Sequence, residues 1–340
     1  MRIAIVNDLS LAREILKRLV LSVPGYSIAW LAEDGDEAIK KASQDTPDAI
    51  LMDLVMPRVN GVEATRAIMK QNPCPVLVVT STIKGHYELA IAAISAGALD
   101  AVETPLMGSG GVIQNGQPLL NRLSKLVDAN RGVSGSAFHV PLRSGNPIGD
   151  YPPLVVIGSS TGGPDALASV ISAFPPDFPA AIVISQHIAA EFAPTLASWL
   201  GDRCRLPVRT ARIGDIPTAG SVLIAETNDH LEIGSDHKLH YTASPRHYPY
   251  RPSIDVLFSS AAAIWPRLGI GLLLTGMGSD GADGLLRLRS MGWHTIIQDE
   301  ATCVVYGMPK AAAEKKAAME ILPLAQIGPT ISAKIFGKIR

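Results

Sequence analysis

The sequence predicts an α/β protein built from two doubly wound parallel-sheet domains. Short apolar runs, each the length of a buried strand, alternate with segments of helical spacing. Two glycine-rich turns, at residues 158–163 and 275–281, each connect such an apolar run to a predicted helix. A stretch rich in glycine, serine and proline separates the chain into two α/β halves. A length of 340 residues is enough for about two or three domains.

Composition and charge exclude several classes of protein. Hydrophobic residues make up 47% of the chain, yet no apolar run approaches the ~20 residues that cross a bilayer. The first residues, MRIAIVND, enter a strand directly and lack the apolar core and cleavage site of a signal peptide. A net charge of −1 gives no electrostatic basis for binding nucleic acid or anionic lipid. Cys74, Cys204 and Cys303 are scattered, which predicts neither a disulfide framework nor a zinc site. We therefore expect a cytoplasmic protein that neither binds nucleic acid nor inserts into a membrane.

The first half has the order of a doubly wound sheet. Buried strands are predicted at residues 3–6, 28–32, 49–52, 76–79 and 99–102. Between and after them, helical spacing is found at residues 12–20, 36–43, 87–96 and 119–127. This alternation predicts one parallel sheet with helices on both faces.

Three polar residues follow strands of that sheet, namely Asp8, Asp53 and Thr80. The carboxyl ends of parallel strands meet at one edge, so these side chains are expected to converge. Two carboxylates and a hydroxyl suit a hard divalent cation beside an aspartate that accepts a phosphoryl group. The alternative is that Asp8 and Asp53 only cap the helices or turns that follow them.

Residues 51–68, LMDLVMPRVNGVEATRAI, resemble the phosphoacceptor loop of response-regulator receiver domains. The family's D-x-x-M-P-x-x-x-G pattern is matched by Asp53, Met56, Pro57 and Gly61. The resemblance covers residues 1–125 and implies a flavodoxin-like receiver domain. It also implies that Asp53 is the phosphoacceptor, that Asp8 and Asp53 hold Mg²⁺, and that Thr80 is a switch hydroxyl.

Two residues depart from the receiver pattern. Asn7 precedes Asp8 where receivers usually carry a pair of acids, and Thr104 precedes Pro105 where they carry a lysine. In the family that lysine pairs with the phosphoryl group. The resemblance therefore implies a receiver with a changed switch at Thr80 and Thr104.

A linker is predicted at residues 126–152, where glycine, serine and proline accumulate without helical or strand spacing. Beyond it, residues 153–340 are predicted to form a second, three-layer Rossmann-like domain. Its strands are expected at residues 154–157, 180–185, 222–225, 231–233, 239–242, 270–274 and 295–297, the fourth and fifth forming an added antiparallel hairpin. Its helices are expected at residues 166–174, 192–200, 254–264 and 309–316, with Pro164 at a helix start.

Three predicted strand ends in this second domain offer Ser160, His187 and Asp280. If the strands are neighbours, these residues form a nucleophile, a general base and an acid that orients the base. The adjacent turns offer the backbone N–H groups of Thr161 and Met277 as an oxyanion hole. Two alternatives remain open: plain tight turns, or nucleotide-phosphate loops, although G-x-G-x-x-G is absent.

The motifs IGSSTGG, SQHI, RPSIDVLF, LTGMGSDGA and QDEATCVVYGMP resemble the catalytic domain of chemotaxis protein-glutamate methylesterases, the CheB family. Five separated motifs occur in the family's order from residue 154 onward. The resemblance implies a catalytic triad of Ser160, His187 and Asp280, with Thr161 and Met277 at the oxyanion hole. The receiver segments VND and VETP further resemble the WspF branch, which serves a surface-sensing pathway.

The family resemblance implies hydrolysis of γ-glutamyl methyl esters on the cytoplasmic helices of methyl-accepting chemoreceptors, with possible deamidation of glutamines. The esterase reaction needs no cofactor, whereas the receiver needs Mg²⁺ and a histidine kinase of the CheA type as phosphodonor. In this family the unphosphorylated receiver covers the catalytic cleft, and phosphorylation relieves the block. Because the receiver is altered here, a non-catalytic adaptor or phosphate sink is the alternative function.

Overall fold

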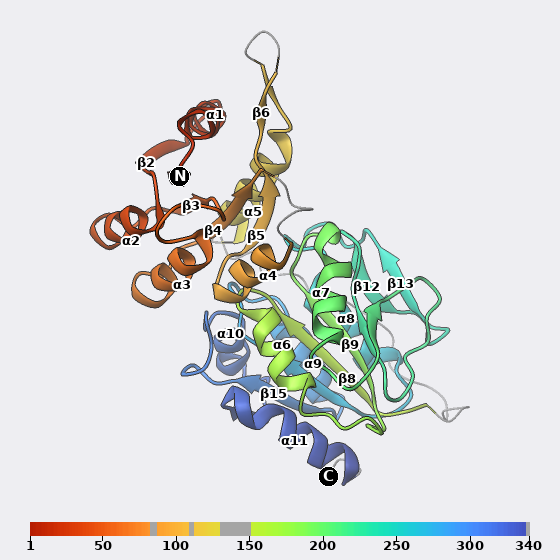
Figure 1. Cartoon of the computed structure of the whole chain (residues 1–340). Helices are drawn as coiled ribbons and strands as arrows, with labels where there is room; N and C mark the ends of the chain where they lie inside the picture. Colours follow the sequence, from red (N-terminus) through yellow and green to blue (C-terminus); the bar gives the residue numbers. More distant parts are fainter. Residues whose placement is uncertain (82–86, 109–111, 130–150, 338–340) are drawn as a thin grey trace. The chain divides into compact units, whose positions relative to one another are not determined.

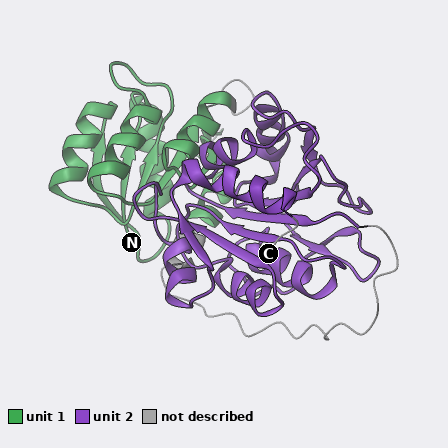
Figure 2. Cartoon of the chain, turned by 90° about the horizontal axis from the view of Figure 1, so that it is seen from below, with its two compact units in different colours: residues 1–132 green, residues 133–340 purple. Residues whose placement is uncertain are grey.

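The computed structural model describes residues 1–81, 87–108, 112–129 and 151–337. The chain divides into two compact units, Met1–Gly132 and Val133–Arg340 (Figure 2). Most of the predicted linker, residues 126–152, lies outside the described residues, so its limits stay a prediction. Across the described part of the chain, every helix is too short or too polar to span a membrane.

Unit 1 contains the predicted parallel sheet, with the strand order β2-β1-β3-β4-β5. Its strands are β1 (Arg2–Val6), β2 (Ser27–Ala32), β3 (Ala49–Met52), β4 (Val76–Thr80) and β5 (Asp100–Glu103). Each pair of neighbours is parallel. The prediction of a doubly wound, flavodoxin-like sheet is therefore confirmed.

Helices cover both faces of this sheet (Figure 1). They are α1 (Ser10–Leu21), α2 (Gly35–Gln44), α3 (Gly61–Gln71), α4 (Tyr87–Ala96) and α5 (Gln117–Ala129). Because side chains alternate along a strand, Ile3 and Ile5 of β1 share one face, where they pack in a core with Leu16 of α1 and Leu119 of α5. A short hairpin of β6 (Leu106–Met107) and β7 (Ile113–Gln114) was not predicted.

Unit 2 contains a seven-stranded parallel sheet in the order β10-β11-β9-β8-β14-β15-β16. The strands are β8 (Leu154–Ser159), β9 (Ala181–Gln186), β10 (Val208–Thr210), β11 (Val222–Ile224), β14 (Ile270–Leu273), β15 (His294–Gln298) and β16 (Glu320–Leu322). The edge strands β10 and β16 were not predicted. The predicted antiparallel hairpin is β12 (His230–Ile233) with β13 (Leu239–Thr242).

Helices flank this second sheet on both sides (Figure 1), which confirms the three-layer prediction. They are α6 (Gly163–Ile171), α7 (Ala193–Gly201), α8 (Ile254–Ile264), α9 (Ala282–Ser290), α10 (Met308–Glu314) and α11 (Leu324–Phe336), with a 3₁₀ turn at Ala190–Phe192. The core joins one sheet face to α8 and α9 and includes Trp265 and Trp293. Helix α11 was not predicted.

The strand order places a switch point beside β8. From β9 the chain crosses to the edge strand β10 and comes back to β11, which lies between β10 and β9, and it later pairs β14 with the other side of β8. Crevices at such switch points, at the carboxyl ends of the strands, are where open α/β sheets bind ligands. The two predicted glycine-rich turns follow β8 and β14, so both lie at this edge.

Candidate active site

Ser160 lies directly after β8, in the turn that leads into α6. Its backbone N–H donates to the carbonyl of Thr275, 3.0 Å away, at the end of β14. Its carbonyl accepts from Gly163 N at 2.8 Å and from Gln186 Nε2 at 2.9 Å. Hydrogen bonds from both neighbouring strand ends therefore fix the backbone of Ser160 at the switch point.

Glycines allow the two turns to meet. Gly162 has a φ of +77°, and a Cβ there would lie 2.6 Å from the side chain of Val304. A Cβ on Gly276 would lie 2.7 Å from Cβ of Ser160. The close approach of the two turns, which brings Gly276 against the serine, thus depends on residues without side chains.

His187 follows β9, and its N–H donates to the carbonyl of Ser159 at 3.0 Å. Its ring Nε2 lies 2.7 Å from Oδ2 of Asp280. The other ring nitrogen, Nδ1, is buried and has no hydrogen-bond partner within the described part of the chain. Since the bond to a carboxylate places the ring proton on Nε2, the lone pair of Nδ1 is left to accept a proton.

Asp280 is held at the amino end of α8. Its Oδ1 accepts from Ser253 Oγ at 2.8 Å, from Asp255 N at 3.1 Å and from Gly281 N at 3.0 Å. Its Oδ2 accepts from Ile254 N at 2.8 Å in addition to His187. Burial opposes the charge of Asp280, but the hydrogen bond with His187 and those from the helix N–H groups hold its pKa below the ordinary value. Asp280 is therefore a carboxylate at neutral pH.

A second buried carboxyl group, Asp255, lies beside Asp280. Burial, followed by the negative charge of Asp280, raises the pKa of Asp255 well above its usual range. Its Oδ1 accepts from Gly284 N of α9 at 2.6 Å. Of the two acids, Asp280 thus carries the charge. The motif RPSIDVLF contains Asp255, but the sequence analysis gave this residue no role.

Backbone N–H groups are available beside the serine. Among the described residues, the N–H groups of Thr161 and Met277 donate no hydrogen bond to the protein. The Thr161 N–H shares its peptide group with the Ser160 carbonyl, whose hydrogen bonds from Gly163 N at 2.8 Å and Gln186 Nε2 at 2.9 Å fix the direction of that N–H. Free N–H donors of this kind are what an oxyanion hole requires, and the role of these two groups there stays a prediction.

Gln186 is a supporting residue that the sequence analysis missed. It is buried between β8 and β9, and its Oε1 accepts from Ser159 Oγ at 2.6 Å. Its Nε2 donates to the carbonyls of Ser160 at 2.9 Å and His187 at 3.0 Å. The side chain therefore ties the two strand ends that carry the serine and the histidine.

In unit 1, a pocket of about 410 Å³ lies at the carboxyl ends of β1, β3 and β4. Its lining includes Asn7, Asp8, Asp53, Thr80 and Thr104, so the residues predicted for phosphorylation and switching do converge. Thr104 continues the strand pairing, with its N–H donating to the carbonyl of Thr80 at 2.9 Å.

Asn7 contacts the predicted phosphoacceptor directly. Its Nδ2 donates to Oδ2 of Asp53 at 2.8 Å, and its own Oδ1 accepts from Leu9 N at 2.9 Å. The amide oxygen is thus turned away from Asp53, and among the described residues that line the pocket Asp8 and Asp53 supply the carboxylates. Two carboxylates with water fit Mg²⁺, which usually binds through one or two such groups.

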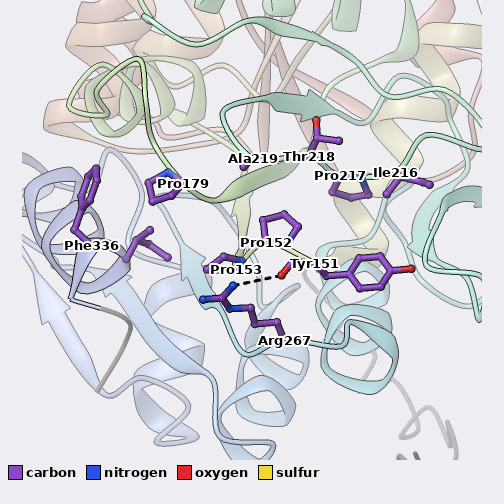
Figure 3. A pocket seen from close by; sticks show the side chains of 11 residues that line it. Tyr151, Pro152, Pro153, Pro179, Ile216, Pro217, Thr218, Ala219, Arg267 and Phe336 are labelled. Atoms are coloured by element: carbon purple, nitrogen blue, oxygen red, sulfur yellow. Dashed lines mark hydrogen bonds between the residues drawn. The ribbon is translucent and has the colours of Figure 1, made fainter. Parts of the chain in front are cut away.

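A larger cavity of about 560 Å³ lies at the opposite end of the sheet in unit 2 (Figure 3). Its lining includes Pro152, Pro179, Ala219 and Arg267, which precede β8, β9, β11 and β14. Arg267 Nη1 donates to the carbonyl of Tyr151 at 3.5 Å (Figure 3). Among the residues that the structure describes, the lining holds no acid and no histidine, so these residues offer no carboxylate or imidazole as a general base.

Comparison with known families and proteins adds to this geometry. Residues 155–331 match the family model for CheB methylesterase, and residues 3–108 match that for the response regulator receiver domain. The chain is 48% identical to protein-glutamate methylesterase/protein-glutamine glutaminase 4 of Burkholderia thailandensis, over 96% of this chain and 95% of that protein. It is 49% identical to protein-glutamate methylesterase/protein-glutamine glutaminase 1 of Bordetella avium, over 99% and 97%.

A solved structure is similar to unit 2. The crystal structure of the Thermotoga maritima CheB methylesterase catalytic domain superposes with a TM-score of 0.52 at 36% identity. The match covers 54% of this chain and 99% of that domain.

Proposed function

This chain belongs to the CheB methylesterase family and is a receiver-containing protein-glutamate methylesterase, and on that basis we propose that Ser160, His187 and Asp280 form its catalytic triad. The substrates are γ-glutamyl methyl esters on the cytoplasmic helices of methyl-accepting chemoreceptors. The observation that carries the proposal is the imidazole of His187, bound to Asp280 at Nε2 and unpaired at Nδ1.

Ester cleavage follows from this arrangement. Nδ1 of His187 takes the proton of Ser160 as Oγ forms a bond to the ester carbonyl carbon. The carbonyl oxygen becomes an oxyanion and accepts hydrogen bonds from the N–H groups of Thr161 and Met277. Collapse of the intermediate breaks the bond to the methoxy oxygen, which leaves as methanol with the proton from His187. Asp280 stabilises the imidazolium in each half-reaction.

Water completes the cycle. His187 removes a proton from a water molecule, whose oxygen attacks the acyl-enzyme carbonyl, and Ser160 regains its hydrogen as free glutamate is released. The same acyl-enzyme can form from a glutamine side chain with ammonia as the leaving group. Deamidation of receptor glutamines is therefore proposed as a second activity of the same site.

The receiver controls this reaction through Asp53. Asp53 accepts a phosphoryl group from a histidine kinase of the CheA type, and the carboxylates of Asp8 and Asp53 hold Mg²⁺. The cation neutralises charge on the phosphoryl oxygens when it is bound. A cytoplasmic location is part of the same proposal, because the kinase and the receptor helices proposed as partners are cytoplasmic. Its assignment to the WspF branch stays a prediction.

The decisive experiment compares two serines in one turn. Ser160→Ala should lower the rate of methanol release from a methyl-esterified receptor fragment by several orders of magnitude, because the nucleophile is lost. Ser159→Ala is the matched control, since the hydrogen bond that Ser159 Oγ donates within the described residues goes to Gln186. Activity retained in Ser160→Ala but lost in Ser159→Ala would assign the nucleophile to Ser159. No activity in the wild-type chain would favour the adaptor or phosphate-sink function.

A further inference from the structure

The ring of Tyr250 lies flat against the ring of His187. The two centroids are 4.3 Å apart and the planes differ by 13°. Tyr250 belongs to the segment between β13 and α8, which contributes no strand to the sheet. Burial raises the pKa of Tyr250 to about 12, so its phenol is neutral wherever the esterase works.

A buried histidine clamps the segment that carries Tyr250. His230, on β12, accepts at Nδ1 from Ser253 N at 3.0 Å and donates from Nε2 to the carbonyl of Pro245 at 3.1 Å. Its side chain is inaccessible to solvent. One imidazole therefore ties together both ends of residues 245–253, and Tyr250 projects from a segment with fixed ends.

The stacked ring of Tyr250 can fix the plane of the His187 imidazole, which the hydrogen bond to Asp280 does not fix. The bond from Nε2 of His187 to Asp280 fixes one edge of the imidazole, but a single hydrogen bond does not fix the plane of the ring. The direction of the unpaired Nδ1 depends on that plane. A stacked aromatic ring restricts rotation of the imidazole and covers one of its faces.

We propose that Tyr250 is a positioning residue of the esterase, which sets the plane of the His187 ring and so aims Nδ1 at the proton of the nucleophile. The proposal rests on the proposed function of His187 as general base. Only the aromatic ring of Tyr250 orients the imidazole, and its hydroxyl group takes no part. Phenylalanine at this position should therefore preserve the activity.

The test compares Tyr250→Leu, Tyr250→Phe and Tyr248→Leu in the whole chain, with acetyl phosphate and Mg²⁺ present. Methanol release from a methyl-esterified receptor fragment gives kcat and KM. Tyr250→Leu should lower kcat by about 10- to 100-fold with little change in KM, the usual scale for a misaimed reacting group. Tyr250→Phe should keep kcat within about threefold of the wild-type value. Tyr248→Leu is the matched control, because Tyr248 lies on the same segment and its ring stacks on that of His247, whereas Tyr250 stacks on His187.

NMR of the His187 ring protons reports the stack without reference to activity. These protons should be shifted by the ring current of Tyr250 in the wild-type and Tyr250→Phe chains, and the shift should vanish in Tyr250→Leu. Loss of kcat in Tyr250→Phe, or equal losses in Tyr248→Leu and Tyr250→Leu, would overturn the proposal. Full activity in Tyr250→Leu beside an inactive Ser160→Ala would overturn it while leaving the proposed function intact. Activity in Ser160→Ala would instead refute the triad itself.

Discussion

The imidazole of His187 has a different task at each nitrogen, and the substitutions at this residue and at Asp280 should separate them. His187→Gln removes the base and should lower kcat/KM by at least as much as Asp280→Asn, because loss of the acid in a triad is the milder defect. Asp280→Asn should still lose about four orders of magnitude, since the neutral amide no longer orients or stabilises the imidazolium. Kinetics of methanol release with the whole chain measure both values.

The pH profile tests the same pair of residues. A histidine base is inactive once it is protonated, so activity should fall as the pH is lowered. Asp280 does not limit this range because its lowered pKa keeps it ionised there. A flat profile from pH 5 to 8 would argue against a histidine base.

The residues that we propose as the triad could be named one by one from the sequence, whereas the residues that contact them could not. Ser160, His187 and Asp280 each follow an apolar run, so the rule that strand ends converge was enough to bring them together. Tyr250 and His230 lie outside the parallel sheet, where no periodicity fixes the path of the chain. Asp255 lies within a helical pattern, and its proximity to Asp280 depends on the packing of α8 against α9.

At the scale of elements, α8 and α9 exchange caps at their amino ends. Asp280, just before α9, accepts from the first N–H groups of α8, and Asp255 of α8 accepts from Gly284 N of α9. Helix N-termini favour negative charge, but two adjacent carboxylates repel each other. Both helix ends can therefore be capped at the same time only because Asp280 is charged and Asp255 is neutral.

The Asp255→Asn variant should be more stable than the wild-type chain, and the difference in the free energy of unfolding should grow as the pH rises. The folded-state pKa of Asp255 is raised, so its contribution is fully present below the unfolded value of about 4 and is lost as pH rises toward the folded value. Asparagine keeps an oxygen for Gly284 N and carries no charge. Relative to the wild-type chain, the free energy of unfolding should rise between pH 4 and 7, as urea titrations can measure. A variant that becomes less stable over this range would show that Asp255 is ionised.

Helix α11 shows why one element escaped prediction. Gly328 and Pro329 interrupt its apolar pattern and are typical of a break, yet both lie inside the helix. A Cβ on Gly328 would lie 2.7 Å from the carbonyl oxygen of Val170 and 2.7 Å from Cβ of Ala173. The glycine is therefore required by close packing of α11 against α6, a tertiary contact that local sequence does not reveal.

Gly328→Ala should consequently lower the free energy of unfolding by about 1–3 kcal/mol through overpacking, with kcat unchanged. Gly201→Ala at the end of α7 is the control, because the nearest atom to its added Cβ is 3.8 Å away. Thermal unfolding of both variants provides the measurement. Equal melting temperatures for Gly328→Ala and the wild-type chain would mean that α11 has room to move.

For the whole molecule, both sheets were predictable because buried parallel strands are continuous apolar runs bounded by turns. The edge strands β10 and β16 were missed because each has only three residues and is partly exposed. The hairpin β6–β7 lies in a glycine-rich stretch that resembles a loop. In the receiver pocket, the sequence showed that Asn7 departs from the family pattern, but not that its amide donates to Asp53.

That hydrogen bond and Thr104 together predict a weaker switch. Asn7 contributes no carboxylate to Mg²⁺, and its amide already donates a hydrogen bond to Oδ2, one of the two carboxylate oxygens of Asp53. Thr104 supplies no cation to the phosphoryl group, so a charge-assisted hydrogen bond of roughly 1.5–3 kcal/mol is missing. A ligand shifts an equilibrium only by its differential affinity for the two states, so phosphorylated Asp53 has less free energy with which to bias the receiver.

Residues 151–340 alone should therefore release methanol faster than the unphosphorylated whole chain, and acetyl phosphate with Mg²⁺ should recover only part of the difference. Thr104→Lys should enlarge that recovery, because its ammonium group can pair with the phosphoryl oxygens. Thr104→Met is the matched control, a long side chain without charge. Equal rates for the fragment and the unphosphorylated chain would show that the receiver does not inhibit the catalytic domain. Full recovery in the wild-type chain, or the same gain from lysine and methionine, would show that the missing cation does not limit the switch.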